Sequence, residues 1–161
     1  MIALVPAARG GSWVNLWQPG RDLYQEAVSS ALKALADFPE GKARIRGVLW
    51  LQGESDAQDN RYADYSARLS NVIAGLRRDL DETELPFIAC TIGTFIRPER
   101  FNRVPEINEV LLTLPDREPF TACVDARDVI GHIGDQLHYD TASQEIIGQR
   151  YAETYLQLTG W

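Results

Sequence analysis

Four short apolar runs, separated by helical patterns, constrain the fold of this 161-residue chain more than any other feature. The runs cover residues 2–8, 45–51, 87–92 and 121–126, and each is almost continuously hydrophobic. Strands buried on both faces of a parallel sheet have this composition, whereas half-exposed strands alternate apolar and polar residues. The sequence therefore predicts four strands of a mostly parallel sheet.

Helical periodicity fills the intervals between these runs. Apolar residues recur on one face over residues 23–35, 62–80 and 107–114, and the third pattern stops before Pro115. Thr141 with Gln144 forms a capping box for a last helix that reaches about Leu158. Alternating strands and helices predict a three-layer α/β/α sandwich with flavodoxin-like topology, as a single domain over residues 1–161.

Composition and charge exclude several classes of function. A net charge of -7 and a pI near 4.8 argue against a nucleic-acid or membrane surface, because both need a clustered basic patch. No segment approaches the length of a transmembrane span, and the first apolar run is too short for a signal peptide. Cys90 and Cys123 lie inside strand-like runs, which favours buried free thiols and leaves the cellular compartment open.

Polar clusters follow each apolar run at the point where a strand would end. They occupy residues 9–12, 52–56, 91–94 and 125–138. Parallel strands end at the same edge of a sheet, and ligands of such sheets bind at that edge. We therefore expect these clusters to converge on one site.

A histidine with a carboxylate three residues before it lies in the last cluster. Asp135 is placed to bond to Nδ1 of His138, which would leave Nε2 of that ring free to act as a base. An Asp-x-x-His pair also forms local turn hydrogen bonds without any catalytic role. The other histidine, His132, has no carboxylate at matching spacing and is interpreted as a structural or rim residue.

Donors suited to an oxyanion hole lie at two of the predicted strand ends. Gln52 offers a side-chain amide, and Gly11 and Gly53 offer backbone N–H groups that no Cβ obstructs. Glu54 follows directly, and a carboxylate at the end of a buried strand needs a partner. Arg9, or the backbone of a neighbouring loop, could supply that partner.

Tryptophans flank the same clusters. Trp13, Trp17 and Trp50 could form a wall on which a sugar stacks, although tryptophan belongs to the core more often than to a ligand platform.

These residues together resemble a known family. The stretch G-V-L-W-L-Q-G-E-S-D-A at residues 47–57 resembles the W-x-Q-G-E-x-D motif of the sialate O-acetylesterase-like domain. That domain is grouped with the acetylxylan esterases of carbohydrate esterase family 6 in the SGNH hydrolase superfamily. V-P-A-A-R-G-G-S-W-V-N-L-W at residues 5–17 and D-Q-L-H-Y-D-T-A-S-Q-E-I-I-G-Q-R-Y-A-E at residues 135–153 are similar to its flanking blocks. The three blocks occur in the family's order.

The resemblance implies a serine esterase that removes acetyl groups from carbohydrates, or from other small esters, without a metal or cofactor. By position, His138 would be the general base and Asp135 its orienting carboxylate. Gln52 and the Gly11 amide would stabilise the oxyanion, and Glu54 would fix the strand-end loops.

One part of the family pattern is missing from this chain. The family's nucleophile is the serine of a Gly-Gln-Ser-Asn turn after its first strand, and no such turn occurs here. Neither Ser12 nor Ser55 occupies the corresponding position. The chain is therefore expected to be truncated at its N-terminus relative to the family and to lack that strand, which in the family lies between the first two predicted here.

Several outcomes follow from that gap. Residues 2–8 pair directly with residues 45–51, or a separate N-terminal segment supplies the strand, or the chain is a fragment. An oligomer also stays open. Two other functions stay open: an inactive carbohydrate-binding module on the same fold, and a flavodoxin-like domain that cradles phosphate with residues 9–12.

Overall fold

The computed structural model describes residues 2–160 and contains three parallel strands in that range. The strands are β1 (Val48–Trp50), β2 (Phe87–Cys90) and β3 (Thr121–Val124). The α-helices are α1 (Asp22–Ala36), α2 (Tyr65–Asp79), α3 (Val104–Leu112) and α4 (Thr141–Thr159). Short 3-10 helices η1 (Val14–Trp17), η2 (Tyr62–Asp64) and η3 (Leu114–Asp116) connect them.

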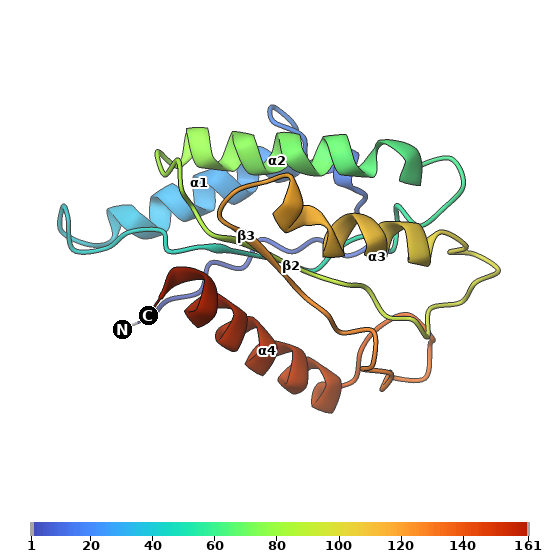
Figure 1. The fold of residues 1–161 in the computed structure, drawn as a ribbon. Helices are drawn as coiled ribbons and strands as arrows, with labels where there is room; N and C mark the ends of the chain where they lie inside the picture. The colour runs from blue at the N-terminus through green and yellow to red at the C-terminus, as the bar shows by residue number, and fades with distance from the viewer. Residues whose placement is uncertain (1, 161) are drawn as a thin grey trace.

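The sheet has the strand order β1-β2-β3, with Leu49 opposite Ile88 and Ala89 opposite Cys123. Helices α1, α2 and α3 lie on one face of this sheet, and α4 lies on the other (Figure 1). The predicted α/β/α architecture with a parallel sheet is confirmed. Its helices also fall close to the predicted ranges, because the apolar periodicity of each one matches the face that it buries.

Two hydrophobic clusters, one on each face of the sheet, hold the layers together. Along β2, Phe87 and Ala89 face the cluster under α1, α2 and α3, while Ile88 and Cys90 face the cluster under α4. All four residues are buried, as the continuous hydrophobicity of this run predicts. The buried Tyr151 hydroxyl of α4 donates to the Trp50 carbonyl at 2.8 Å and ties the last helix to β1.

The prediction of a strand at residues 2–8 is wrong. Residues 2–8 form no strand, and Ile2 and Leu4 are 86% and 82% exposed. A strand is stable only when a neighbouring strand takes up its backbone N–H and C=O groups, and residues 2–8 have no such neighbour among the described residues. Direct pairing of residues 2–8 with residues 45–51 is therefore ruled out in this structure.

The remaining predicted strands exist but are shorter than their apolar runs. β1 covers only Val48–Trp50 of the run at residues 45–51 and pairs on one side alone, with β2. No strand among residues 2–160 pairs with its other edge, and Leu49 and Leu51 are 54% and 41% exposed. A short, one-sided ladder explains why this strand ends early.

The start of α4 also differs from the expectation. The N-cap is Asp140, whose Oδ1 accepts the Ser143 N–H at 2.8 Å, and Thr141 is already helical. Gln144 donates to the Tyr139 carbonyl at 3.0 Å instead of completing a capping box. Aspartate is as good an N-cap as threonine, so the helix begins one residue earlier than predicted.

Both cysteines are free, as predicted. Cys90 is buried and Cys123 is partly buried, and desolvation raises the pKa of each thiol to about 12. At neutral pH both are therefore protonated and unreactive.

Candidate active site

The turn that follows β1 brings several polar side chains of the predicted site together. Gly53 begins this turn, and its carbonyl accepts the N–H groups of Asp56 and Ala57 at 3.0 and 2.9 Å. A Cβ on Gly53 would lie 2.7 Å from Cγ2 of Ile107 and 3.3 Å from Cγ2 of Ile92, and the φ angle of Gly53 is +152°. Only glycine fits there without displacing a buried isoleucine.

The side-chain amide of Gln52, which directly precedes the turn, links the turn to residues 9–12. Its Nε2 donates to the Ser12 carbonyl at 3.1 Å and to Oδ2 of Asp56 at 2.5 Å, so both amide hydrogens have acceptors. Its Oε1 is buried without a hydrogen-bond partner among the described residues. To donate to an oxyanion, the Gln52 amide would have to break its hydrogen bond to Ser12 or to Asp56. The role of Gln52 as an oxyanion donor stays a prediction.

Asp56 lies at the centre of this arrangement and is fully buried. Besides the Gln52 amide, its Oδ2 accepts the Val14 N–H at 2.9 Å, which links the turn after β1 to η1. Desolvation raises the pKa of Asp56, and the hydrogen bonds from Gln52 and Val14 offset part of that effect. Sequence reasoning gave Asp56 no role, although the family motif W-x-Q-G-E-x-D ends on it.

Glu54 lies in the same turn and is close enough to His138 for their charges to interact. Burial raises the pKa of Glu54, while the backbone N–H groups of Glu54 and Gly53, and the His138 charge, act in the opposite direction. The suggested partner Arg9 does not reach it. Arg9 instead forms an exposed ion pair with Glu26 at 3.5 Å, so the backbone supplies the compensation.

The predicted Asp135–His138 pair is present in the structure. Nδ1 of His138 lies 2.5 Å from Oδ2 of Asp135, while Oδ1 of Asp135 accepts the backbone N–H groups of Leu137 and His138, each at 3.0 Å. These backbone and side-chain hydrogen bonds hold the pKa of Asp135 well below its usual range. Oδ1 of Asp135 therefore stabilises the local turn, while Oδ2 orients the His138 imidazole. Both interpretations of the Asp-x-x-His spacing hold, because the two carboxylate oxygens bind different partners.

The orientation of His138 leaves its second ring nitrogen available. The side chain is 65% exposed, and Nε2 has no hydrogen-bond partner among the described residues. An imidazole whose Nδ1–H is donated to a carboxylate carries a lone pair on Nε2 and is suited to accept a proton there.

The turn at residues 9–12 is the second place where an oxyanion donor was expected. Gly11 has a φ of +71°, is exposed, and its N–H has no acceptor within the described part of the chain. Ser12 is buried, and its Oγ donates to the Arg9 carbonyl at 2.7 Å and accepts from Trp17 Nε1 at 2.9 Å. The Ser12 hydroxyl thus builds the turn and is not exposed as a nucleophile would be.

The tryptophans divide between core and surface. Trp17 and Trp50 are buried and meet edge to face at 5.7 Å between ring centroids, so both belong to the core. Trp13 is partly buried, and the guanidinium groups of Arg61 and Arg68 lie 4.9 and 5.2 Å from its ring centroid. Two guanidinium groups already pack on this ring, so Trp13 does not form an open wall for sugar stacking.

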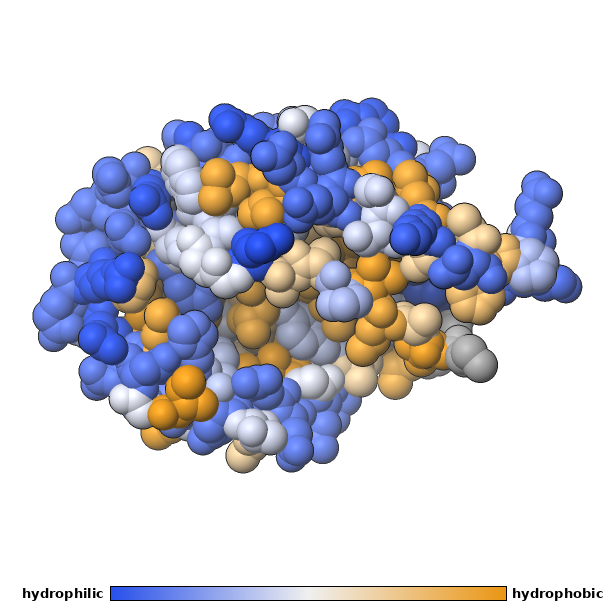
Figure 2. All heavy atoms as spheres, turned by 180° about the vertical axis from the view of Figure 1, so that it is seen from behind, coloured by the Kyte–Doolittle hydropathy of each residue, from blue (hydrophilic) through white to orange (hydrophobic). Residues whose placement is uncertain are grey.

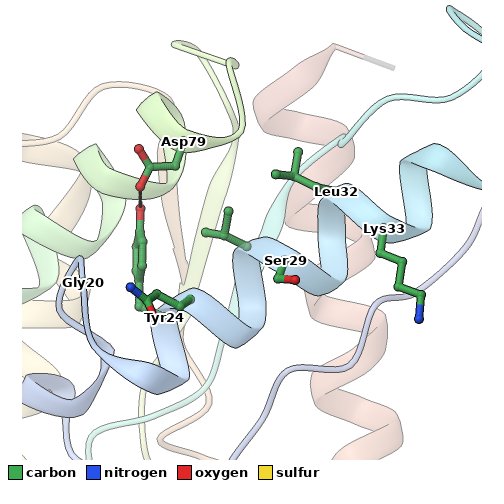
Figure 3. Close-up of a pocket in the computed structure, with 8 residues that line it drawn as sticks. Gly20, Tyr24, Ser29, Leu32, Lys33 and Asp79 are labelled. Atoms are coloured by element: carbon green, nitrogen blue, oxygen red, sulfur yellow. Dashed lines mark hydrogen bonds between the residues drawn. The ribbon is translucent and has the colours of Figure 1, made fainter.

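Two hollows lie on the surface near the N-terminal half of the chain. One is lined by the turn at residues 9–12 together with Leu16 and residues 20–23. The other runs along α1, where the Tyr24 hydroxyl donates to Asp79 at 2.6 Å and Ser29, Leu32 and Lys33 line the wall (Figure 3). The second hollow contains none of the predicted catalytic residues. The face opposite to that of Figure 1 is also hollowed, with hydrophobic atoms at its floor (Figure 2).

Two further kinds of feature are absent from residues 2–160. No group of three or more His, Cys, Asp or Glu side chains is placed to hold a metal ion. No helix in this range is long and apolar enough to cross a bilayer.

Comparison with known proteins adds independent evidence. The sequence profile of the family described as "carbohydrate esterase, sialic acid-specific acetylesterase" matches residues 1–157. A probable carbohydrate esterase of Arabidopsis thaliana is 32% identical over 157 residues, which is 97% of this chain and 56% of that protein. A probable 9-O-acetyl-N-acetylneuraminic acid deacetylase of Escherichia coli K12 is 30% identical over 99 residues, 50% of this chain and 30% of that protein.

Solved structures agree with this result. An X-ray structure of a protein from Arabidopsis thaliana superposes with a TM-score of 0.82 at 29% identity, covering 94% of this chain and 59% of the other. A carbohydrate acetylesterase from Xanthomonas citri superposes with a TM-score of 0.63 at 18% identity, covering 94% of this chain and 36% of the other, and supports the fold alone. The chain thus spans little more than half the length of the Arabidopsis relative. By its sequence and its fold, it belongs to the carbohydrate esterase, sialic acid-specific acetylesterase family.

Proposed function

We propose that this chain supplies the base, the oxyanion donors and the binding surface of a serine carbohydrate O-acetylesterase. The observation that carries this proposal is the Asp135–His138 pair, with Nδ1 held at 2.5 Å from a carboxylate and Nε2 free. The family assignment and the nearby Glu54 and Gln52 turn support it. The substrate class is an acetylated sugar, as the names of the family and of the Escherichia coli relative suggest.

The reaction requires a nucleophilic serine that residues 2–160 do not present at this site. The Ser12 hydroxyl is hydrogen-bonded within its own turn, and Ser55 follows Glu54 instead of standing in a Gly-Gln-Ser-Asn sequence. We propose that an additional strand pairs with the open edge of β1 and carries this serine at its carboxyl end. The exposed Leu49 and Leu51 at that edge support the proposal, because an added strand would bury them.

The chemistry follows from the free Nε2 of His138. This atom takes the proton of the serine hydroxyl while the serine oxygen bonds to the acetyl carbon, and the carbonyl oxygen becomes an oxyanion. The Gly11 N–H, and a Gln52 amide hydrogen if it is released, would stabilise that charge. The bond to the sugar oxygen then breaks, and His138 gives its proton to that oxygen, which leaves as the sugar hydroxyl. Water repeats the sequence at the acetyl-serine and releases acetate.

Hydrolysis of 4-nitrophenyl acetate tests this proposal. The chain would be assayed alone and with a peptide of about six apolar residues followed by Gly-Gln-Ser-Asn, and the matched control is the same peptide with Ala in place of Ser. We expect turnover only with the serine peptide, and loss of that turnover in His138→Ala. Peptide binding without any turnover would contradict the esterase mechanism, and no peptide binding would contradict the role of the β1 edge.

A carbohydrate-binding module is the second candidate, favoured by the Ser12 hydroxyl, whose hydrogen bonds within its own turn keep it from acting as a nucleophile. Calorimetry with 9-O-acetyl-N-acetylneuraminic acid separates the two. Binding that persists in His138→Ala, without hydrolysis in any complemented form, would favour the module. Binding of FMN instead would contradict both candidates.

A further inference from the structure

The Asp135–His138 pair lies in a small hairpin whose conformation is held from outside. An antiparallel bridge between His132 and Tyr139 closes this hairpin, and the Ile133 N–H donates to the His138 carbonyl at 3.1 Å. Gln136, next to Asp135, has a φ of +54°, a left-handed conformation that side chains disfavour. Such a conformation persists only where neighbouring groups over-determine it.

Arg97, in the loop after β2, provides the first external contact. Its Nε and Nη2 donate to the Asp135 carbonyl at 3.1 and 2.6 Å, and its backbone N–H donates to the Gln136 carbonyl at 3.3 Å. The guanidinium therefore bonds to the backbone of Asp135 and leaves the carboxylate to His138. The guanidinium fixes the peptide group before Gln136, and the Arg97 backbone N–H fixes the peptide group after it.

Phe95 provides the second contact, at the other end of the hairpin. Its ring stacks on His132 at 5.1 Å between centroids and meets Tyr139 edge-on at 5.1 Å, so it packs on both bridge residues. A Cβ on Gly93 would lie 2.5 Å from Cε1 of Phe95. Glycine at this position is therefore what allows the ring to reach the hairpin.

His132 braces the hairpin from inside. Its Nδ1 accepts the Gly134 N–H at 3.0 Å and, more weakly, the Gln136 N–H at 3.4 Å. This requires the tautomer with hydrogen on Nε2, the opposite of the tautomer that His138 needs to donate from Nδ1 to Asp135.

We propose that residues 93–97 are a positioning segment for the base, in which Arg97 sets the orientation of the His138 imidazole through the Asp135 backbone and Phe95 holds the hairpin closed. This inference rests on the proposed function, in which His138 is the base. Arg97 touches no reacting atom in that scheme and acts only through Asp135.

The chain contains two histidines, so ring 15N–1H correlation spectra resolve each one. In the unsubstituted protein we expect an Nδ1–H signal from His138, which donates to Asp135, and an Nε2–H signal from His132, whose Nδ1 accepts the Gly134 N–H. In Arg97→Gln the His138 Nδ1–H should exchange with water about fivefold faster, the effect of losing one net hydrogen bond. Arg97→Lys, which retains a charge but has one donor group, should show a smaller increase.

Arg100→Gln is the matched control, since Arg100 is exposed in the same loop and lies over the ring of Phe101. It should leave both histidine signals unchanged. Phe95→Leu is the second variant, and it should disturb the His132 signal as well as that of His138.

Unchanged exchange of the His138 Nδ1–H in both folded Arg97→Gln and folded Phe95→Leu would overturn the inference. The readout needs no ester, so it is separate from the test of the proposed function. An intact histidine signature without any hydrolysis in the complemented protein would contradict the proposed function and leave the positioning role standing.

Discussion

Replacing Gly53 with alanine tests whether the turn after β1 is as tightly enclosed as its geometry indicates. The added Cβ would lie 2.7 Å from Cγ2 of Ile107, and both Ile107 and Ile92 are completely buried. Overpacking a core costs about 1–3 kcal/mol, and a φ of +152° adds a cost of order 1 kcal/mol for a residue with a side chain. We therefore expect Gly53→Ala to lower the free energy of unfolding by about 3 kcal/mol.

For a chain of this length that loss lowers Tm by about 6–12 °C. Differential scanning calorimetry measures Tm, and urea unfolding followed by tryptophan fluorescence measures the free energy. Gly10→Ala is the matched control, because its added Cβ meets no atom within 4 Å. It should change stability by less than about 0.5 kcal/mol. Equal Tm values for the two variants would refute the close approach of Gly53 to Ile107.

Three further predictions concern the polar residues around this turn. Asp56→Ala should destabilise the protein by about 2–4 kcal/mol in urea unfolding, because it leaves the Val14 N–H and one hydrogen of the Gln52 amide unpaired in a buried site. Burial raises the pKa of Glu54, so its contribution to stability is present below the unfolded pKa, about 4.3, and is lost as pH rises through the folded pKa. Glu54→Gln should therefore gain stability relative to the unsubstituted protein as pH rises from about 4 to 7 in a series of thermal melts. His138→Ala should leave Tm unchanged in the same melts, because the imidazole is 65% exposed, while it abolishes hydrolysis in the complemented esterase.

Each of these has a clear contrary result. Unfolding of Asp56→Ala at the urea concentration of the unsubstituted protein would contradict the buried network. A Tm difference between Glu54→Gln and the unsubstituted protein that stays constant with pH would contradict the raised pKa. A large loss of Tm in His138→Ala would show that the imidazole supports the fold, contrary to its exposure.

The sequence by itself determined the architecture and indicated a candidate site, whose catalytic role stays a prediction. Continuous apolar runs at residues 87–92 and 121–126 indicated buried parallel strands, and polar residues after them indicated the functional edge. The spacing of Asp135 and His138 was sufficient to predict their pairing, because three residues of a turn bring these side chains together without help from distant parts of the chain.

Only the tertiary structure decided features that depend on partners far apart in the sequence. The apolar residues 2–8 have the composition of a strand but lack a neighbouring strand, and no local pattern reveals that. The Gln52 amide donates to the Ser12 carbonyl, 40 residues before it, and the hairpin of His138 is held by Arg97, 38 residues before the Asp135 carbonyl. Every residue has a backbone carbonyl, so a hydrogen bond to one depends on the path of the chain and not on the type of residue. The sequence therefore gave no signal for these two contacts.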